Sequence, residues 1–243
     1  MEGGTLSVEA MQTASIILIP GLLCDGYVWE PLLERLGHQG VVADLTTQDS
    51  IAQMASDCLV LADGPLAVAG HSMGARVAME MARIAPHRIE RLALLDTGIH
   101  PLREGEAEKR AEVVRLAHEK GMEALADRWL PGMVWYENRG NATLMSQLRQ
   151  MVLRRNPKEH ERQIKALVGR PDASTYIAQI NCRTLLVVGR YDNWSPVTQH
   201  KEMLALLPDA RLEIIEAAGH FTPVEQPSTV AHLLADFLLS KEN

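Results

Sequence analysis

The sequence predicts an α/β fold: a mostly parallel central sheet of about six strands, flanked by helices and carrying a helical cap insertion. Three observations predict it. Short apolar runs alternate with helical stretches along much of the chain. Most of those runs are nearly continuous in Val, Leu, Ile and Ala, which is typical of strands covered on both faces. A long stretch without a strand then interrupts the alternation.

The predicted strands are short apolar runs bounded by turn residues. They are Ser15–Pro20, Gly40–Asp44, Pro65–Gly70, Arg91–Asp96, Arg183–Gly189 and Arg211–Ala217. Helices are expected over Trp29–Leu36, Ser50–Leu61, Met73–Ile84, Gln199–Leu207 and Ser228–Leu239. Because strands and helices alternate, the connections between parallel strands should be right-handed.

The stretch without a strand runs from Ile99 to about Ile180, and its residue pattern is typical of helices. Helices are predicted over Glu104–Lys120, Met122–Leu130, Thr143–Arg155 and Pro157–Val168, with Gly121 past the end of the first. Four consecutive helices exceed what one crossover between strands requires. We therefore expect residues 99–180 to form a cap over one edge of the sheet, and residues 1–98 and 181–243 to form the core. The alternative is that these helices simply flank the sheet.

Composition and charge narrow the possible partners. A formal net charge of −7 argues against a nucleic-acid backbone or an anionic membrane. The longest apolar run is broken at Pro20 and is too short to span a bilayer, and the N-terminus lacks the features of a signal peptide. Cys24, Cys58 and Cys182 fit neither a disulfide framework nor a zinc site. We expect a cytoplasmic, reduced protein, a monomer or homodimer that acts on a small molecule.

The pattern Gly-x-Ser-x-Gly at residues 70–74 lies between a predicted strand and a predicted helix. In that context it is typical of a sharp turn that projects a serine hydroxyl clear of the sheet. The turn requires strained backbone angles at the serine and flanking residues without a Cβ. The free N–H groups at the start of the helix can stabilise a developing negative charge. We therefore interpret Ser72 as a nucleophile.

A serine hydroxyl needs a base to remove its proton, so a histidine must lie within reach. His220 is the candidate among nine histidines. It follows the last predicted strand, and Gly219 permits a sharp loop at the carboxyl edge of the sheet, where sites form. The others lie in helices or in connections without a matching motif. His71 adjoins the serine, but we expect its side chain to point away from that of Ser72.

A carboxylate should orient the histidine, and Asp192 is the favoured candidate. It follows the strand Arg183–Gly189, and the order Ser72, Asp192, His220 is the one that a triad on such a sheet requires. Asp96, after the preceding strand, is the main alternative and could instead be a structural turn acid. Asp44 is a weaker third candidate.

Two N–H groups are needed to bind the oxyanion of a tetrahedral intermediate. The N–H of Met73 directly follows the nucleophile, and the second should come from the loop after the first strand. Gly21 lets that loop turn, so the N–H of Leu22 is the best candidate. The sequence contains no Gly-x-Gly-x-x-Gly, P-loop or His-Glu-x-x-His pattern, so we expect no cofactor and no metal.

Three segments, Gly70–Gly74, Gly189–Pro196 and Gly219–Pro223, together resemble the α/β-hydrolase family of small single-domain serine esterases and related hydrolases. The resemblance covers nearly the whole chain from Ser15. It implies a sheet with a nucleophile elbow at its centre and a helical lid inserted between two strands.

Two features depart from the family pattern. The usual His-Gly after the first core strand is Pro20-Gly21 here, which bears on the oxyanion loop. Only residues 1–14 precede the first core strand. We therefore expect the family's first two antiparallel strands to be missing, or reduced to a stub near Leu6–Val8.

Apolar side chains occur in the segments that should surround the serine. The expected pocket residues, besides the two oxyanion donors, are Leu23, Trp29, Trp129, Met133, Trp135 and Trp194. A pocket of this kind predicts a carboxylesterase-like enzyme that cleaves esters of small to medium, uncharged apolar acyl groups through an acyl-enzyme. A thioesterase, a carbon–carbon bond hydrolase or a perhydrolase could use the same triad. A non-catalytic receptor is disfavoured because all three polar side chains are present.

Overall fold

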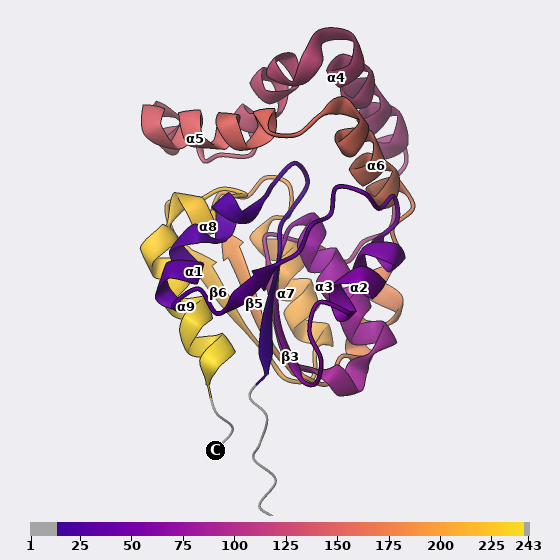
Figure 1. The fold of residues 1–243 in the computed structure, drawn as a ribbon, viewed down its shortest axis with the longest axis vertical. Coiled ribbons are helices and arrows are strands. Elements are labelled where there is room, and N and C mark those ends of the chain that lie inside the picture. Colours follow the sequence, from indigo (N-terminus) through magenta and orange to yellow (C-terminus); the bar gives the residue numbers. More distant parts are fainter. Residues whose placement is uncertain (1–13, 241–243) are drawn as a thin grey trace, which may run out of the picture.

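Parallel strands form one sheet in the computed structural model, which describes residues 14–240 (Figure 1). Within that range the sheet has six strands: β1 (Ser15–Ile19), β2 (Gly40–Val42), β3 (Leu66–His71), β4 (Ile89–Leu95), β5 (Arg183–Gly189) and β6 (Ala210–Ile215). Their order is β2-β1-β3-β4-β5-β6, and every neighbouring pair is parallel. The predicted α/β class is confirmed. The stub expected near Leu6–Val8 lies outside the described residues.

Helices cover both faces of the sheet. They are α1 (Glu30–Arg35), α2 (Ile51–Leu59), α3 (Met73–Ile84), α7 (Val197–Leu206), α8 (Thr222–Glu225) and α9 (Pro227–Leu239). α1 packs against α9, and α2 packs against α3. Figure 1 shows the first pair on one side of the sheet and the second pair on the other. The parallel sheet is therefore enclosed between two helical layers.

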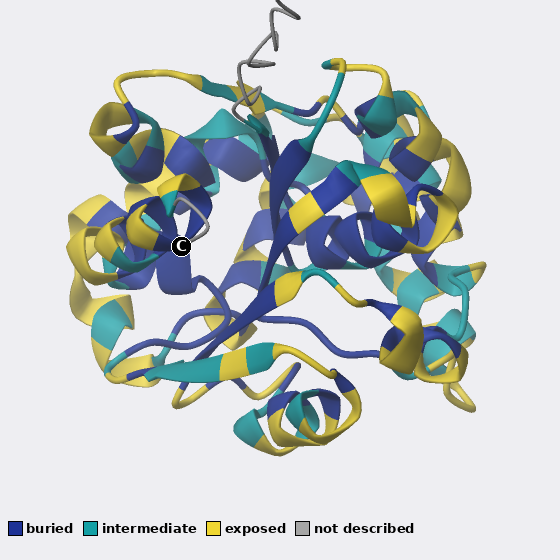
Figure 2. Cartoon of the chain, turned by 90° about the horizontal axis from the view of Figure 1, so that it is seen from below, coloured by how far each residue is buried: buried dark blue, intermediate teal, exposed yellow. Residues whose placement is uncertain are grey.

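The two faces of each central strand contribute to two different hydrophobic cores. In β1, Ile16 and Leu18 belong to the core that contains α1 and α9, whereas Ile17 and Ile19 belong to the core that contains α2 and α3. This alternation explains why the strand sequence is apolar throughout, since both faces are removed from water. Figure 2 shows the central strands buried and the exposed residues on the outer sides of the helices.

Three further helices lie together beyond one end of the sheet (Figure 1). They are α4 (Glu106–Trp129), α5 (Ala142–Leu153) and α6 (Pro157–Val168). α4 contains the two helical segments predicted on either side of Gly121, and it is kinked at Gly121, whose φ of 83° and ψ of 174° are not helical. α6 begins at a capping box in which Asn156 and Glu159 satisfy each other's free backbone groups. We retain residues 99–180 as the proposed cap and residues 1–98 and 181–243 as the proposed core.

Some predicted bounds are wrong by a few residues because a turn begins earlier than the apolar run suggests. The last strand, predicted to reach Ala217, ends at Ile215, because Ala217 has a φ of 53° in the turn toward His220. The first helix, predicted from Trp29, is preceded by a 3-10 turn over Gly26–Trp29, which the side chain of Asp25 caps. Within residues 14–240, no helix has both the length and the apolar composition to cross a membrane.

Candidate active site

Ser72 occupies the junction between β3 and α3. Its φ of 54° and ψ of −112° lie in a region that a residue with a side chain rarely adopts, and such a conformation costs about 1–3 kcal/mol. Its N–H donates to the carbonyl oxygen of Leu95 at 2.8 Å, which holds the turn against β4. The sharp, strained turn that the sequence predicts is therefore present, and its strain is compensated by the surrounding sheet.

The turn also requires close approach between backbones. A Cβ added to Gly74 would lie 2.2 Å from the carbonyl oxygen of Ile19. No side chain fits in that space, so glycine lets the start of α3 pack directly on the end of β1. The same contact brings the loop after β1 toward Ser72.

The structure brings Ser72, His220 and Asp192 into one chain of hydrogen bonds. The Oγ of Ser72 lies 2.8 Å from Nε2 of His220, and Nδ1 of His220 lies 2.8 Å from Oδ2 of Asp192. With the imidazole proton on Nδ1, the serine hydroxyl donates to Nε2 and Nδ1–H donates to the carboxylate. The three side chains, far apart in the sequence, thus have the arrangement in which a histidine can accept the proton of a serine.

The carboxylate of Asp192 is buried and accepts further hydrogen bonds. Oδ1 accepts from the N–H groups of Trp194 and Ser195 at 2.8 and 3.0 Å, and Oδ2 accepts from the Ser195 hydroxyl at 2.8 Å. Burial alone would raise the pKa of Asp192, but His220 and these donors lower it below its usual value. Asp192 is thereby held ionised. The role of Ser195 was not predicted from the sequence, although an Asp that bonds backbone groups two and three residues later is a common turn.

The alternative acid, Asp96, lies nearby but has different partners. Its carboxylate accepts hydrogen bonds from the N–H of Gly189 at 3.2 Å and from both the N–H and the hydroxyl of Thr222. Burial, together with the charge of Asp192, raises the pKa of Asp96 well above its usual value. The imidazole of His220 is therefore hydrogen-bonded to Asp192. Asp96 is instead bonded to Thr222, two residues after His220.

The loop that carries His220, residues 216–221, is called the histidine loop and is held by the buried carboxylate of Glu225. Oε1 of Glu225 accepts from the N–H groups of Gly219 and Phe221 at 2.9 and 3.2 Å. Oε2 accepts from the N–H of Trp135 and the side-chain amide of Asn138, both at 2.9 Å. One acid thus joins the histidine loop to the segment after α4. No pattern in the sequence indicates this role, because Trp135 and Asn138 lie 90 and 87 residues from Glu225.

The two histidines near Ser72 have opposite electrostatic environments. Burial would lower the pKa of His220, but the adjacent carboxylate of Asp192 outweighs that effect and raises it. Burial, with the neighbouring His220, lowers the pKa of His71 to about 3. Nε2–H of the neutral His71 donates to the carbonyl oxygen of His220 at 2.7 Å. His71 therefore supports the backbone of the histidine loop.

The two predicted oxyanion donors lie on segments that meet at Ser72. A Cβ on Gly21 would lie 3.2 Å from Cβ of Ser72, so the loop after β1 passes directly beside the serine. That loop turns at Leu23, whose φ is 61°, and closes with a hydrogen bond from Cys24 N–H to the carbonyl of Gly21. Among residues 14–240, the N–H groups of Leu22 and Met73 donate no hydrogen bond. Both are available to an oxyanion.

Three of the predicted pocket residues, Trp129, Met133 and Trp135, lie at the end of α4 or shortly after it. The carbonyl of Met133 accepts the N–H of His220 at 2.8 Å. The indole of Trp129 makes an edge contact with Phe221, with ring centroids 6.0 Å apart. The indole of Trp135 stacks on Tyr191 at 4.7 Å.

The other three predicted pocket residues have different surroundings. Leu23 is fully buried in the core on the α1 side. Trp29 is also fully buried, in the same core as Leu32 and Val230. Trp194 is 53% exposed, although its backbone N–H donates to Asp192. Contact of these side chains with a substrate stays a prediction.

Comparison with known proteins gives relatives over most of the chain. A sequence model described as "Alpha/beta hydrolase family" matches residues 16–233. A Bacillus subtilis protein with the provisional name 2-succinyl-6-hydroxy-2,4-cyclohexadiene-1-carboxylate synthase is 28% identical over 184 residues, which cover 70% of this chain and 65% of that protein. An Escherichia coli protein with the provisional name carbamate hydrolase RutD is 27% identical over 246 residues, which cover 93% and 91%.

Solved structures share the same architecture. A thermophilic esterase from Thermogutta terrifontis superposes with a TM-score of 0.85 at 25% identity, covering 93% of this chain and 90% of that one. The enol-lactonase from Burkholderia xenovorans LB400 superposes with a TM-score of 0.84 at 22% identity, covering 94% and 92%. Because the family match spans nearly all of the described residues, the chain belongs to the α/β-hydrolase family.

Proposed function

We propose that this protein is a carboxylesterase-like serine hydrolase that cleaves esters of small to medium apolar acyl groups through an acyl-enzyme. The observation that carries the proposal is the unbroken chain of hydrogen bonds from Ser72 through His220 to Asp192. Membership of the α/β-hydrolase family and the similarity to an esterase at 25% identity support it.

In the first half of the proposed reaction, Oγ of Ser72 attacks the ester carbonyl carbon while Nε2 of His220 takes the hydroxyl proton. Asp192 stabilises the resulting imidazolium through its bond to Nδ1. The carbonyl oxygen becomes an oxyanion that accepts hydrogen bonds from the N–H groups of Leu22 and Met73. The tetrahedral intermediate then expels the alcohol oxygen, which receives the proton from His220, and the acyl group remains on Ser72.

In the second half, a water molecule attacks the acyl-enzyme and His220 takes one of its protons. The new tetrahedral intermediate uses the same two oxyanion donors. Its collapse breaks the bond between the acyl carbon and Oγ of Ser72, and His220 returns the proton to the serine. The products are the free acid and the unchanged enzyme, so no cofactor or metal takes part in the proposed cycle.

The preference for an apolar acyl group follows from the surroundings of His220. Phe221 is fully buried and its ring stacks on that of His71 at 5.4 Å. Trp129 and the partly buried Leu22 add apolar surface from the cap and the oxyanion loop. Side chains of this kind favour contact with hydrocarbon and penalise an unpaired charge.

The proposal is tested with p-nitrophenyl esters of increasing acyl length. We expect the wild type to release nitrophenol from short- and medium-chain esters, and Ser72→Ala to lose that activity. Equal turnover by the two proteins would exclude Ser72 as the nucleophile. A parallel series of thioesters with the same acyl groups separates an esterase from a thioesterase, because only the leaving atom changes.

We also propose a cytoplasmic location and a monomeric or homodimeric state. All three cysteines are unpaired, Cys24 and Cys58 buried and Cys182 partly so, as is usual for proteins in a reducing compartment. The net charge of −7 favours a small-molecule substrate over a nucleic acid. Fractionation of the native cells and sedimentation of the purified protein test these two points.

A further inference from the structure

The side chain of Gln163, on cap helix α6, bridges two loops of the core. Its Oε1 accepts the N–H of Leu23 at 2.9 Å, and its Nε2 donates to the carbonyl oxygen of Leu45 at 3.1 Å. Gln163 is 1% exposed, and both hydrogen bonds are buried. A buried amide with a donor and an acceptor both satisfied fixes the position of each partner.

Gln163 bonds the loop after β1 at Leu23, where the backbone of that loop is strained. Leu23 has a φ of 61°, a left-handed conformation that a residue with a side chain adopts only when its surroundings hold it there. The N–H of Leu23 belongs to the peptide plane that begins at the carbonyl of Leu22. Fixing that N–H therefore fixes the rotation of the loop directly after Leu22.

The position of Leu22 matters because its N–H is one of the two oxyanion donors in the proposed function. A donor must lie within about 3.1 Å of the site where the oxyanion forms, so a small rotation of the loop weakens it. The other donor, Met73, is fixed by the first turn of α3, whereas Leu22 lies in an irregular loop. Within its own segment, Leu22 is held by the bond from Cys24 N–H to the carbonyl of Gly21 and by the Cys24 thiol, which donates to the Leu22 carbonyl at 3.3 Å. Gln163 adds support from outside that segment.

We propose that Gln163 is a positioning residue for the oxyanion hole: it holds the Leu22–Leu23 peptide so that the N–H of Leu22 faces the reacting carbonyl. The inference rests on the proposed function and adds a role for the cap. Packing of α6 on the core places Oε1 of Gln163 on the loop, so the proposed cap contributes to the site through this bond.

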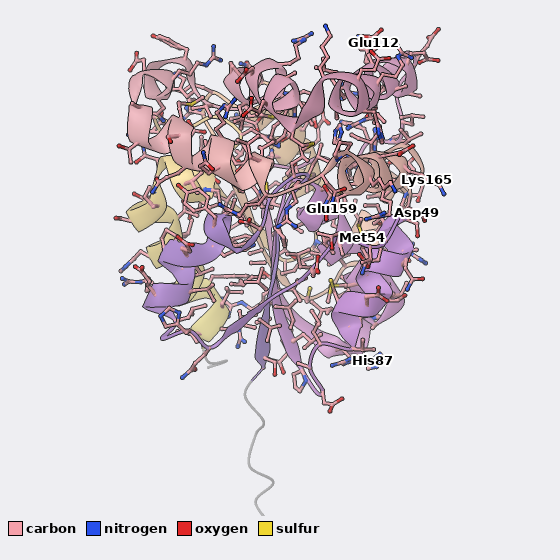
Figure 3. The ribbon with its side chains drawn as sticks, turned by 45° about the horizontal axis from the view of Figure 1, so that its top comes forward. Asp49, Met54, His87, Glu112, Glu159 and Lys165 are labelled. Atoms are coloured by element: carbon pink, nitrogen blue, oxygen red, sulfur yellow. The ribbon has the colours of Figure 1, made fainter. Side chains whose placement is uncertain are left out.

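Neighbouring residues of α6 supply matched controls. Nε of Arg162 donates to the carbonyl oxygen of Thr46 at 2.8 Å, and Nζ of Lys165 lies 2.6 Å from the carboxylate of Asp49. Figure 3 shows Lys165 on α6 beside Asp49 of the core. These contacts also tie the cap to the core, but their core partners lie in the segment between β2 and α2. Arg162→Met therefore removes a tie of the same helix without touching Leu23.

The experiment compares wild type, Gln163→Met and Arg162→Met. The first readout is the rate at which a fluorophosphonate labels Ser72, measured by intact mass. In that step Oγ attacks phosphorus, fluoride leaves and His220 takes the hydroxyl proton, while the phosphoryl oxygen occupies the oxyanion hole. The second readout is kcat and KM for p-nitrophenyl butyrate. We expect Gln163→Met to lower the labelling rate and kcat about tenfold, less than the ~10²–10³ of a donor lost outright, with KM little changed.

Thermal melting checks that each variant is folded at the assay temperature. If Gln163→Met is unfolded, Gln163→Glu decides. Burial favours the neutral acid form of this Glu, whose carbonyl oxygen accepts from Leu23 and whose O–H donates to the carbonyl of Leu45, so its labelling rate should stay near that of the wild type. The proposal is overturned if Gln163→Met matches the wild type in both readouts, or if Arg162→Met is slowed equally. It is also overturned if a folded Gln163→Glu is slowed tenfold while Arg162→Met is not.

The two readouts separate this proposal from the proposed function. If the wild type is labelled at Ser72 but hydrolyses no ester, the ester assignment fails, and the labelling rates still decide the role of Gln163. If Ser72 of the wild type is not labelled, both proposals fall.

Discussion

The buried carboxylate of Asp96 accepts two hydrogen bonds from Thr222, one from its N–H at 3.1 Å and one from its hydroxyl at 2.7 Å. Thr222 lies two residues beyond His220, the proposed base. Asp96 therefore holds the loop that carries the imidazole, whereas Asp192 bonds the imidazole itself. The two acids at the carboxyl edge of the sheet have separate structural tasks, and substitution should separate them.

Asp192→Asn should lower kcat/KM for a nitrophenyl ester by orders of magnitude, ~10³–10⁴. An amide in place of the carboxylate no longer holds the imidazole in the productive tautomer or stabilises the imidazolium. Asp96→Asn should affect kcat/KM far less, and should instead lower the free energy of unfolding by about 1–3 kcal/mol, because its new N–H₂ group faces hydrogen-bond donors. Steady-state kinetics and urea unfolding of both variants test this. The reverse pattern would assign the orienting role to Asp96.

The pH dependence of hydrolysis should follow the raised pKa of His220. The base must be neutral to accept the serine proton, so a raised pKa means that activity is lost at a higher pH as the solution is acidified. We expect the ascending limb of kcat/KM to have its midpoint above ~6.5, the ordinary value for histidine. Rates between about pH 5 and pH 9 measure it.

Replacing Asp192, whose carboxylate raises the pKa of His220, should lower that pKa again. In Asp192→Asn, burial remains and the carboxylate is gone, so the pKa of His220 should fall below that in the wild type. Titration of the His220 imidazole by NMR measures this even if the variant turns over slowly. An unchanged titration would show that another group raises the pKa.

Glu225→Gln should lower both activity and stability. Each carboxylate oxygen of Glu225 accepts hydrogen bonds from N–H groups of Gly219, Phe221, Trp135 or Asn138, and the amide nitrogen of Gln cannot accept any of them. A buried N–H left without a partner costs about 1–3 kcal/mol. The loop of His220 should shift as a result, so kcat should fall together with the free energy of unfolding.

The matched control is Glu216→Gln, which removes an exposed partner of Arg190. An exposed ion pair contributes little, so its free energy of unfolding should change by about 0.5 kcal/mol or less. Kinetics and urea unfolding of both variants make the comparison. Equal losses in the two variants would show that Glu225 has no special place in the loop.

The sequence predicts the parts of the fold that depend on local patterns. Continuous apolar runs mark β1, β3 and β5 because both faces of those strands are buried. The turn at Ser72 is predictable because strand, glycines and helix follow one another directly. His220 and Asp192 are predictable because both follow a strand, and parallel strands place their carboxyl ends at one edge.

The remaining features depend on contacts between distant segments. In the sequence, Gln163 is one polar residue of an amphipathic helix. Its role depends on the packing of α6 against the loop at Leu23, which lies 140 residues earlier. Glu225 gains its role only when the segment after α4 packs against the histidine loop. Trp29 carries no local sign of its burial in the core on the α1 side. A residue pattern gives periodicity and order, whereas these roles follow from tertiary packing.

The stability of the protein in acid should depend on His160 of α6. The residue is 1% exposed, and its Nδ1 has no hydrogen-bond partner within residues 14–240. Burial, with the positive charges of His118 and Arg110, lowers the pKa of His160 to about 4. The unfolded chain takes up this proton near pH ~6.5 and the folded chain does not, so the free energy of unfolding falls as pH drops through that window. Between about pH 7.5 and about pH 5, protonation of this one group in the unfolded chain should lower the free energy of unfolding by about 2 kcal/mol.

Urea unfolding at the two pH values tests the role of His160. In His160→Leu the loss of unfolding free energy should be smaller by that amount, whereas His87→Leu, at an exposed site, should lose as much as the wild type (Figure 3). An equal loss in wild type and His160→Leu would mean that acid acts through other groups.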